Sequence, residues 1–448
     1  MNDPTPIQAP ELAEPMTLSV EPYISESYAR AERDLLWAKV WQVACREEEI
    51  PNVGDFYSYE IQDQSIVVVR SAPDEISAYH NVCRHRGRRL TKGCGHATRF
   101  RCAYHGWQYK LDGSNLSVQE REDWQGALDN WPIDLAPVKV GRWSGFVFIN
   151  MDPDCEPLED YLDPVNFWLD PFDLGGMRYA WRKQGKLAAN WKTVIEAFSE
   201  GYHAIVTHPQ TMQFGMPRTW SGGMGKHGLM RNTGVGGGGI GTSISEAKAM
   251  DPRAKLLGAV RQQRETTGSL TTDTFIAAAE KVMDVLTETA TPQEVAMTFM
   301  QLAREMDAER GVIWPNVDPM HQREAGINWS VFPNTVLLQN VTFCFGFRIR
   351  PDGFNPDSCI IEIYHLERFP EGQEPKPEIQ IITENTVENW KLLVFQDLEN
   401  LEEIQKGMKS ISLNRVVPNP FSENSVVNLQ RSLAHYMGRA EPKPYGAS

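Results

Sequence analysis

The feature that most constrains this chain is a pair of short segments in which a cysteine lies close to a histidine. One residue separates Cys83 from His85, two separate Cys102 from His105, and sixteen lie between the two pairs. Each pair sits at a predicted turn beside strand-like sequence, so two loops can close over one metal centre. Four such residues at this spacing are not typical of ordinary buried cysteines and histidines.

Two kinds of metal site use two thiolates and two imidazoles. Structural zinc sites commonly present a cysteine pair followed by a histidine pair, whereas here each loop supplies one of each. In a Rieske [2Fe–2S] cluster the cysteines bind one iron and the histidines the other. The mixed order therefore favours a Rieske cluster, with zinc as the alternative, and Trp107 is placed to shield such a cluster from water.

A second Cys-x-His pair, Cys94 and His96, resembles the first. Only five residues separate it from Cys102, which is short for two facing loops. We interpret Cys94 and His96 as structural, and the isolated histidines at 80, 227, 321, 365 and 435 as structural or exposed.

A second candidate metal site lies in NWKTVIEAFSEGYHAIVTHPQ, residues 190–210. Apolar residues recur there at helical spacing, which predicts a helix over residues 186–206. His203 lies on this helix. His208 precedes Pro209, and a residue before proline disfavours helical geometry. The two imidazoles can then converge on one ion at the point where the helix unwinds.

Two histidines need one carboxylate to complete the facial triad of non-haem Fe(II) oxygenases. A helix predicted over residues 386–411 offers one, because Asp397 falls on its apolar stripe, which is spaced alternately by four and three residues. A buried carboxylate is normally paired or bound to metal. Asp397 is therefore the predicted third ligand, with a capped or salt-bridged aspartate as the alternative. The other stripe members are Trp390, Val394, Leu401, Ile404, Met408 and Ile411.

Composition and charge exclude several classes of protein. The net charge of −15 is unsuited to general nucleic-acid binding, and no apolar run approaches a membrane span. The first residues lack a secretory signal. Seven dispersed cysteines argue against a disulfide framework and favour a reducing, cytoplasmic location. Residues 77–110 carry eight Lys and Arg but no Asp or Glu; this basic block either docks an acidic redox donor or forms internal and subunit contacts.

The pattern along the chain predicts an α+β protein. We expect a helix over residues 24–45, a β-rich domain over 41–155, and strands in 327–351 and 357–369. Further helices are expected over 274–310 and 423–438. The Gly-rich segment 221–243 is predicted to be a loop, either covering a pocket or inert.

The residues resemble one known family over about 40–440: the large (α) subunits of Rieske non-haem iron, aromatic-ring-hydroxylating oxygenases. The resemblance rests on C-x-H-x16-C-x-x-H, on NWK…E…Y-H-x4-H, and on Asp397-x7-Gln405-x-Gly407. It implies a β-rich Rieske [2Fe–2S] domain beside a helix-grip catalytic domain, an antiparallel sheet wrapped around a helix. The implied domains are a lead-in and helix over 1–40, a Rieske domain over 41–155 and a catalytic domain over 156–448.

The resemblance also implies the cofactors and the site residues. Cys83, His85, Cys102 and His105 would hold the cluster, and His203, His208 and Asp397 a mononuclear Fe(II). In the family an acidic residue, usually Asp, bridges the two centres across a head-to-tail trimer. Here that position is Glu200, as in members that act on quaternary ammonium compounds.

The implied activity is that of an oxygenase component. It would take electrons from NAD(P)H through a reductase, with or without a ferredoxin. It would use O2 to mono- or cis-dihydroxylate a small hydrophobic, aromatic substrate. N- or O-demethylation of a quaternary ammonium or methoxy compound is the alternative. The assembly would be a homotrimer or an α3β3 complex with a small β subunit.

Two other classes remain open from sequence alone. A Rieske electron carrier accounts for residues 83–105 but not for the rest of the chain. A zinc-stabilised binding protein predicts zinc and no NADH-coupled oxygen uptake.

Overall fold

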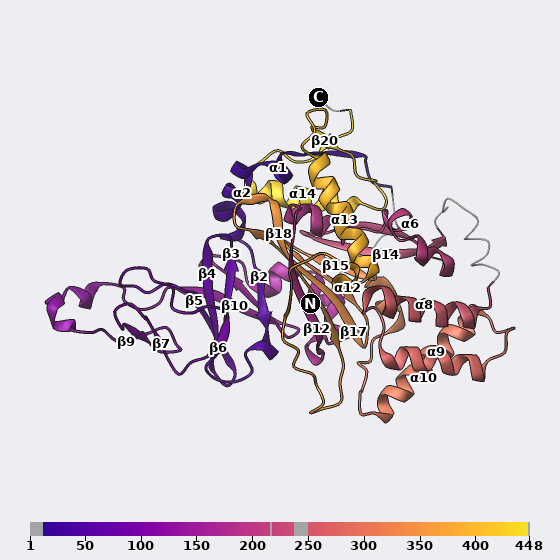
Figure 1. Cartoon of the computed structure of the whole chain (residues 1–448), viewed down its shortest axis with the longest axis horizontal. Coiled ribbons are helices and arrows are strands. Elements are labelled where there is room, and N and C mark those ends of the chain that lie inside the picture. Colours follow the sequence, from indigo (N-terminus) through magenta and orange to yellow (C-terminus); the bar gives the residue numbers. More distant parts are fainter. Residues whose placement is uncertain (1–11, 216, 237–249, 447–448) are drawn as a thin grey trace. The chain divides into compact units, whose positions relative to one another are not determined.

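The computed structural model describes residues 12–215, 217–236 and 250–446. These residues form two compact units, one of residues 30–162 and one that joins the residues up to 29 with those from 163 onward. The first unit is mostly β-strands and loops, and the second combines a large, mainly antiparallel sheet with helices (Figure 1). The predicted α+β class is confirmed.

The unit of residues 30–162 is built on a seven-stranded antiparallel sheet with the order β2-β11-β10-β5-β4-β3-β6. Residues 66–69 of β4 are fully buried, because a continuous apolar run in a central strand packs on both faces. A small sheet of order β7-β8-β9 lies in the same unit. The strands are β2 Gln42–Arg46, β3 Asp55–Ile61, β4 Gln64–Ala72, β5 Glu75–His80, β6 Cys94–His96, β7 Phe100–Arg101, β8 Gln108–Tyr109, β9 Asn115–Ser117, β10 Pro137–Trp143 and β11 Phe146–Asn150, and helix α3 is Leu158–Leu162.

The helix expected over residues 24–45 ends earlier than the sequence indicates. Helices α1 Glu21–Ile24 and α2 Glu26–Glu32 are followed by one π-helical stretch that ends at Trp37. Strand β2 then begins at Gln42 and pairs with β11. The prediction is wrong past Trp37 because pairing with the sheet outweighs the local helical pattern.

The other unit is built on an eight-stranded sheet with the order β13-β14-β15-β16-β17-β18-β12-β19. All neighbours in it are antiparallel except β12 and β19. Its long central strands confirm the sheet predicted for residues 327–351 and 357–369. The strands are β12 Arg178–Leu187, β13 Pro217–Met224, β14 His227–Gly236, β15 Asn328–Val331, β16 Thr335–Gln339, β17 Phe343–Asp352, β18 Asn355–Glu367 and β19 Gln380–Ile382.

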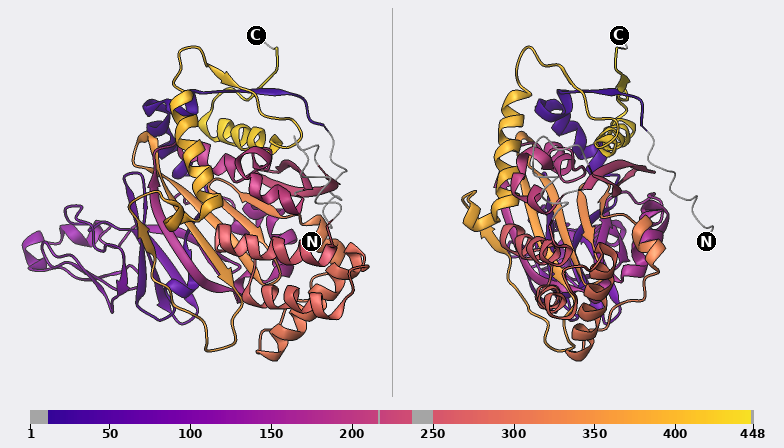
Figure 2. Two further views of the ribbon diagram at one scale, coloured as in Figure 1. Left: turned by 45° about the vertical axis from the view of Figure 1, so that its right-hand side comes forward. Right: turned by 90° about the vertical axis from the view of Figure 1, so that its right-hand side faces the viewer.

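Helices cover this sheet in two groups (Figure 2). Helices α5 and α14 pack on the sheet and on each other, and α13 packs on α5. Helices α8, α9 and α10 form a second cluster, which contacts α13 through α8. The two helices within the predicted range 274–310 and the one predicted near 423–438 are confirmed. The helices are α4 Val165–Leu169, α5 Trp191–Ala197, α6 Ala204–Thr207, α8 Pro252–Thr267, α9 Asp273–Val285, α10 Pro292–Glu309, α11 Pro319–Glu324, α12 Val387–Trp390, α13 Leu392–Gly407 and α14 Asn424–Met437.

Two expectations in this unit are wrong. The helix predicted over residues 186–206 is a strand end followed by the short helices α5 and α6. The Gly-rich segment is a β-hairpin of β13 and β14 up to residue 236, and its residues 237–243 lie outside the described residues. Its glycines serve close packing: a Cβ at Gly223 would lie 2.3 Å from the side chain of Asn428 on α14.

The first described strand is the middle strand of a small three-stranded sheet with the order β20-β1-β21. Strand β1, Met16–Ser19, pairs with β20, Arg415–Val416, on one side and with β21, Lys443–Pro444, on the other. Among the described residues, no helix is both long and apolar enough to span a bilayer.

Candidate metal centres and active site

The two Cys-His segments form turns with the same backbone hydrogen bonds. The Cys83 N–H donates to the Arg88 carbonyl and the Gly87 N–H to the Cys83 carbonyl. The Cys102 N–H donates to the Trp107 carbonyl and the Gly106 N–H to the Cys102 carbonyl. Both glycines have φ near +75°, which L side chains rarely adopt, so glycine is required four residues after each cysteine.

The side chains of these turns converge. The His85 and His105 rings lie 4.5 Å apart between centroids. Cys83 and Cys102 are buried free thiols. The Nδ1 atom of His85 is buried and has no hydrogen-bond partner among the described residues. A buried imidazole nitrogen without a partner fits a metal ligand, and this donor set can hold a [2Fe–2S] cluster.

Aromatic side chains enclose the two turns. Trp107 is 2% exposed and stacks on His85, with ring centroids 5.1 Å apart. Trp124 lies edge-on to both rings. The Tyr109 hydroxyl lies 3.3 Å from Cys83 Sγ and accepts a hydrogen bond from the Arg84 N–H. Sequence reasoning predicted the shielding role of Trp107 and missed Trp124 and Tyr109, which follow no recognisable spacing.

Cys94 and His96 lie on β6, the edge strand of the seven-stranded sheet, which pairs with β3. Cys94 is exposed, and His96 Nδ1 lies 2.9 Å from the Asp55 carboxylate. In the basic block, Arg89 pairs with Glu60 at 3.0 Å. The remaining basic side chains outside Arg84 are exposed.

The second candidate site begins where helix α5 ends. Asn190 caps α5 by accepting a hydrogen bond from the Lys192 N–H. Beyond Ala197 the helix stops, and the Glu200 carboxylate accepts hydrogen bonds from the backbone N–H groups of Tyr202 and His203. A side chain that occupies backbone donors competes with helix formation, which is why the predicted continuous helix breaks here.

His203, His208 and Asp397 come together within this unit. Their candidate ligand atoms all lie within 4.8 Å of one another. The distance from Asp397 Oδ1 is 3.4 Å to His203 Nε2 and 3.0 Å to His208 Nε2. The two histidines flank α6, and Asp397 projects from α13. Two imidazoles and one carboxylate gathered in this way match the donor set of a facial triad.

Each histidine is oriented through its other ring nitrogen. His203 Nδ1 is hydrogen-bonded to the Glu200 carboxylate. His208 Nδ1 lies 3.0 Å from Gln396 Oε1, which also accepts a hydrogen bond from Gln210 Nε2. Such partners orient both rings so that their Nε2 atoms face Asp397, where a metal ion would take the place of a proton.

The electrostatics of this site favour a cation. Burial alone would lower the pKa of His203, but hydrogen bonds to Asp397 and Glu200 raise it to about 10. Burial raises the pKa of Asp397, yet the hydrogen bonds from His203 and His208 outweigh it and lower the pKa. Two buried carboxylates therefore hold positive charge between them.

A cavity of about 570 Å³ opens beside the triad. Its walls come from α5, the α8–α10 cluster and the strands β14 to β17, and the triad residues form part of its lining. Seven phenylalanines line it, and Phe198 stacks on Phe347 with centroids 4.1 Å apart. Among the described lining residues, Glu200 and Asp397 are the acidic ones and there is no Lys or Arg.

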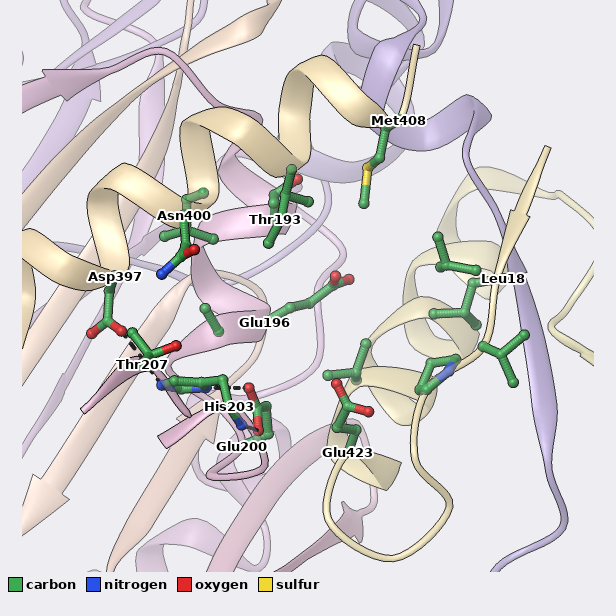
Figure 3. Close-up of a pocket in the computed structure, with 17 residues that line it drawn as sticks. Leu18, Thr193, Glu196, Glu200, His203, Thr207, Asp397, Asn400, Met408 and Glu423 are labelled. Atoms are coloured by element: carbon green, nitrogen blue, oxygen red, sulfur yellow. Dashed lines mark hydrogen bonds and ion pairs between the residues drawn. The ribbon is translucent and has the colours of Figure 1, made fainter. Parts of the chain in front are cut away.

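A second cavity of about 220 Å³ also has His203 in its lining (Figure 3). Glu196, Glu200 and Glu423 project into it. Glu196 accepts hydrogen bonds from the Tyr23 hydroxyl at 2.9 Å and from Gln430 Nε2 at 2.6 Å. Burial raises the pKa of Glu196 to about 8 despite these donors.

The apolar stripe that predicted Asp397 is only partly buried. Asp397 and Leu401 are buried, but Ile404 is half-exposed and Ile411 lies beyond the helix end and is fully exposed. Gln396 was missed, although it directly precedes Asp397. The pairing of Glu196 with Tyr23 was missed because it joins segments 173 residues apart.

Two family models match this chain. Residues 173–439 match the ring hydroxylating alpha subunit (catalytic domain), and residues 40–132 match the Rieske [2Fe–2S] domain. The first match covers more than half of the chain.

Known proteins of two kinds are similar. The carnitine monooxygenase oxygenase subunit of Escherichia coli (strain K12) is 33% identical over 199 residues, which is 44% of this chain and 53% of that protein, so the match spans about half of its length. A crystal structure of a quaternary ammonium Rieske monooxygenase with L-carnitine has a TM-score of 0.63 at 19% identity, covering 94% of this chain and 96% of that one. A naphthalene 1,2-dioxygenase mutant bound to phenanthrene has a TM-score of 0.65 at 18% identity, covering 96% and 94%.

Proposed function

The chain belongs to the Rieske ring-hydroxylating oxygenases, as their large (α) subunit, and we propose that it mono-oxygenates an organic cation of the quaternary ammonium class. It is an oxygenase component with a Rieske [2Fe–2S] cluster and a mononuclear iron. The observation that carries the substrate proposal is the cavity beside the triad, which is lined by phenylalanines and, among its described residues, has acidic but no basic side chains.

The site residues have distinct roles in this proposal. Cys83, Cys102, His85 and His105 hold the cluster, and the His203, His208 and Asp397 triad holds the mononuclear iron. When bound, these groups supply single electrons and a position at which O2 is activated. Gln396 and Glu200 keep the two imidazoles oriented.

The cavity lining supports an organic cation. A trimethylammonium group is attracted to the faces of aromatic rings, and six lining phenylalanines lie in or near the sheet and the α8–α10 cluster: Phe198, Phe275, Phe299, Phe343, Phe345 and Phe347. The carboxylates of Asp397 and Glu200 favour positive charge nearby. The similarity to a carnitine monooxygenase and the glutamate at position 200 point the same way.

We further propose that Glu200 links the triad to a cluster carried by a second copy of the chain. Glu200 contacts His203 and lines the cavity of about 220 Å³. Exposed apolar side chains belong to or adjoin this cavity. Val417 is part of its lining, and Tyr202 and Val206 are close in sequence to Glu200 and His203, which line it. Burial of such side chains is favourable when another subunit covers them. A reductase, with or without a ferredoxin, is the proposed electron source, and the trimer is the proposed assembly.

The experiment that tests the function is oxygen uptake by the reconstituted holoenzyme with NADH and a reductase of the family. Trimethylammonium compounds are compared with aromatic hydrocarbons, and products are identified by mass spectrometry. Formaldehyde or an aldehyde with loss of trimethylamine supports the proposal. The Asp397→Ala variant, which lacks one proposed iron ligand, should keep the cluster's absorption and lose all product.

Hydroxylation of an aromatic substrate is the second candidate, because seven phenylalanines and a volume of about 570 Å³ also suit an uncharged ring. Product from naphthalene or toluene, with none from the cations, would replace the first proposal by this one. Oxygen uptake without any oxygenated product would count against both.

A further inference from the structure

Asn328 differs from the other polar residues of the large cavity. It is the first residue of β15, is 2% exposed and belongs to the cavity lining. In the sheet it lies opposite Met230 of β14, which also lines the cavity. Residues directly opposite one another on neighbouring strands share a face. The Asn328 side chain therefore belongs to the cavity face of the sheet.

The amide of Asn328 has a fixed orientation. Its Nδ2 donates to the Phe198 carbonyl at 2.6 Å, at the point where helix α5 ends. The opposite orientation would place Oδ1 against that carbonyl oxygen, and two acceptors repel. Oδ1 is thus held away from α5. It is buried and accepts no hydrogen bond from any described residue.

Several other polar side chains of this cavity already have partners, and Asn232 and Gln263 are exposed. Thr211 donates to the His208 carbonyl, and Asn340 Oδ1 accepts from the Val341 N–H. Gln339 belongs to the cavity lining and also has an unpartnered Oε1, but its Nε2 donates to the Gly326 carbonyl. Its neighbour on β16, Leu338, pairs with Phe345 of the cavity lining, so the strand alternation directs the Gln339 side chain to the opposite face.

We propose that Asn328 is a specificity-determining residue whose Oδ1 accepts a hydrogen bond from a hydroxyl or N–H group of the substrate. An unpaired buried acceptor is costly, and a substrate that supplies a donor removes this cost. A substrate carboxylate at the same point would face another acceptor. The inference rests on the proposed function, because it takes this cavity as the substrate site. It narrows the substrate class to cations or aromatic rings that carry a hydroxyl or N–H donor.

The test compares compounds that differ by one hydroxyl group. Binding of choline and of ethyltrimethylammonium to the anaerobic holoenzyme is measured by calorimetry without an electron donor, and benzyl alcohol is compared with toluene in the same way. We expect the hydroxyl compound to bind about tenfold more tightly in at least one pair. In Asn328→Leu this preference should fall to within about twofold.

Two further variants separate recognition from folding. Asn328→Ser keeps a hydroxyl that can donate to the Phe198 carbonyl and accept from the substrate, and it should keep part of the preference. Asn334→Leu is the matched control: Asn334 is buried and donates to the Ile349 carbonyl in the same sheet, but it does not line the cavity. This control should keep the wild-type preference even if its melting temperature falls.

The outcomes distinguish the two proposals. A preference for benzyl alcohol that depends on Asn328, with no binding of either cation, keeps the role of Asn328 and refutes the cation proposal. A preference that is unchanged in Asn328→Leu overturns the role of Asn328, as does the absence of a preference in both pairs.

Discussion

Replacement of Gln396 by leucine tests how the second candidate site is organised. Gln396 Oε1 lies 3.0 Å from His208 Nδ1 and is the side-chain acceptor that fixes this ring. Leucine has similar volume and no acceptor. The His208 ring is then free to rotate or to carry its proton on Nε2, which removes it as a ligand. His203 keeps its own partner, Glu200.

The expected magnitude follows from the loss of one orienting hydrogen bond. A hydrogen bond of this kind contributes about 1 kcal/mol, and the loss of such a partner typically weakens metal binding by about 10–100-fold. Because His208 is one of three proposed ligands and Gln396 is only half-buried, we expect the lower part of this range. The dissociation constant of the mononuclear iron should rise about 10–30-fold.

The assay is anaerobic competition with an iron chelator, with the cluster counted separately by its visible absorption. Gln396→Glu restores an acceptor and should restore affinity. Gln405→Leu is the control on the same helix, since Gln405 is hydrogen-bonded to Asn190 and Tyr23 and not to a proposed ligand; it should lower the melting temperature and leave iron affinity unchanged. Iron affinity within twofold of wild type in Gln396→Leu would refute the argument.

Three further predictions concern the surroundings of the two centres. Glu200→Gln should keep both metals and slow single-turnover oxidation of the cluster, measured by stopped-flow absorption; an unchanged rate would exclude Glu200 as the link. Tyr109→Phe removes the hydroxyl 3.3 Å from Cys83 Sγ, and since hydrogen bonds to sulfur raise the potential of a cluster, its midpoint potential should fall by tens of millivolts in a redox titration. Burial raises the pKa of Glu196 to about 8. Between about pH 4.5 and 8 the unfolded chain therefore ionises while the folded one stays protonated, and the free energy of unfolding falls as pH rises, by up to about 5 kcal/mol. Glu196→Gln should flatten the melting temperature over this pH range, and a slope equal to that of wild type would show that Glu196 is ionised in the fold.

Local patterns predicted more of the metal centres than of the fold around them. The Cys83–His105 segment could be interpreted because its four side chains lie in two adjacent turns. Asp397 could be found because a carboxylate on an apolar helical stripe is unusual. The role of each residue as a ligand stays a prediction, while the family and its cofactors are confirmed by the two domain matches.

What the sequence could not predict depends on distant partners. The β13–β14 hairpin was predicted to be a loop because it is rich in glycine. In the structure, glycine is needed there because α14 packs closely against the hairpin, and no local sequence pattern indicates this contact. The break after α5 arises because the Glu200 carboxylate accepts hydrogen bonds from backbone N–H groups. In the sequence alone, Glu200 cannot be distinguished from an ordinary surface glutamate. The expected aromatic substrate is supported less well than the quaternary ammonium alternative. The sequence alone could not predict the substrate class, because this class depends on which side chains face the cavity.

The pairing of β1 with β20 and β21 has a consequence for synthesis of the chain on the ribosome. The unit of residues 30–162 is continuous and can fold as soon as it emerges, whereas the other unit needs residues from both sides of it. The partners of Met16 and Thr17 lie at Pro444 and Lys443. At about 5–20 residues per second, β1 waits on the order of tens of seconds for β21. During this interval Leu18 and Val20, which are buried in the finished fold, stay exposed, and chaperone binding is expected there first.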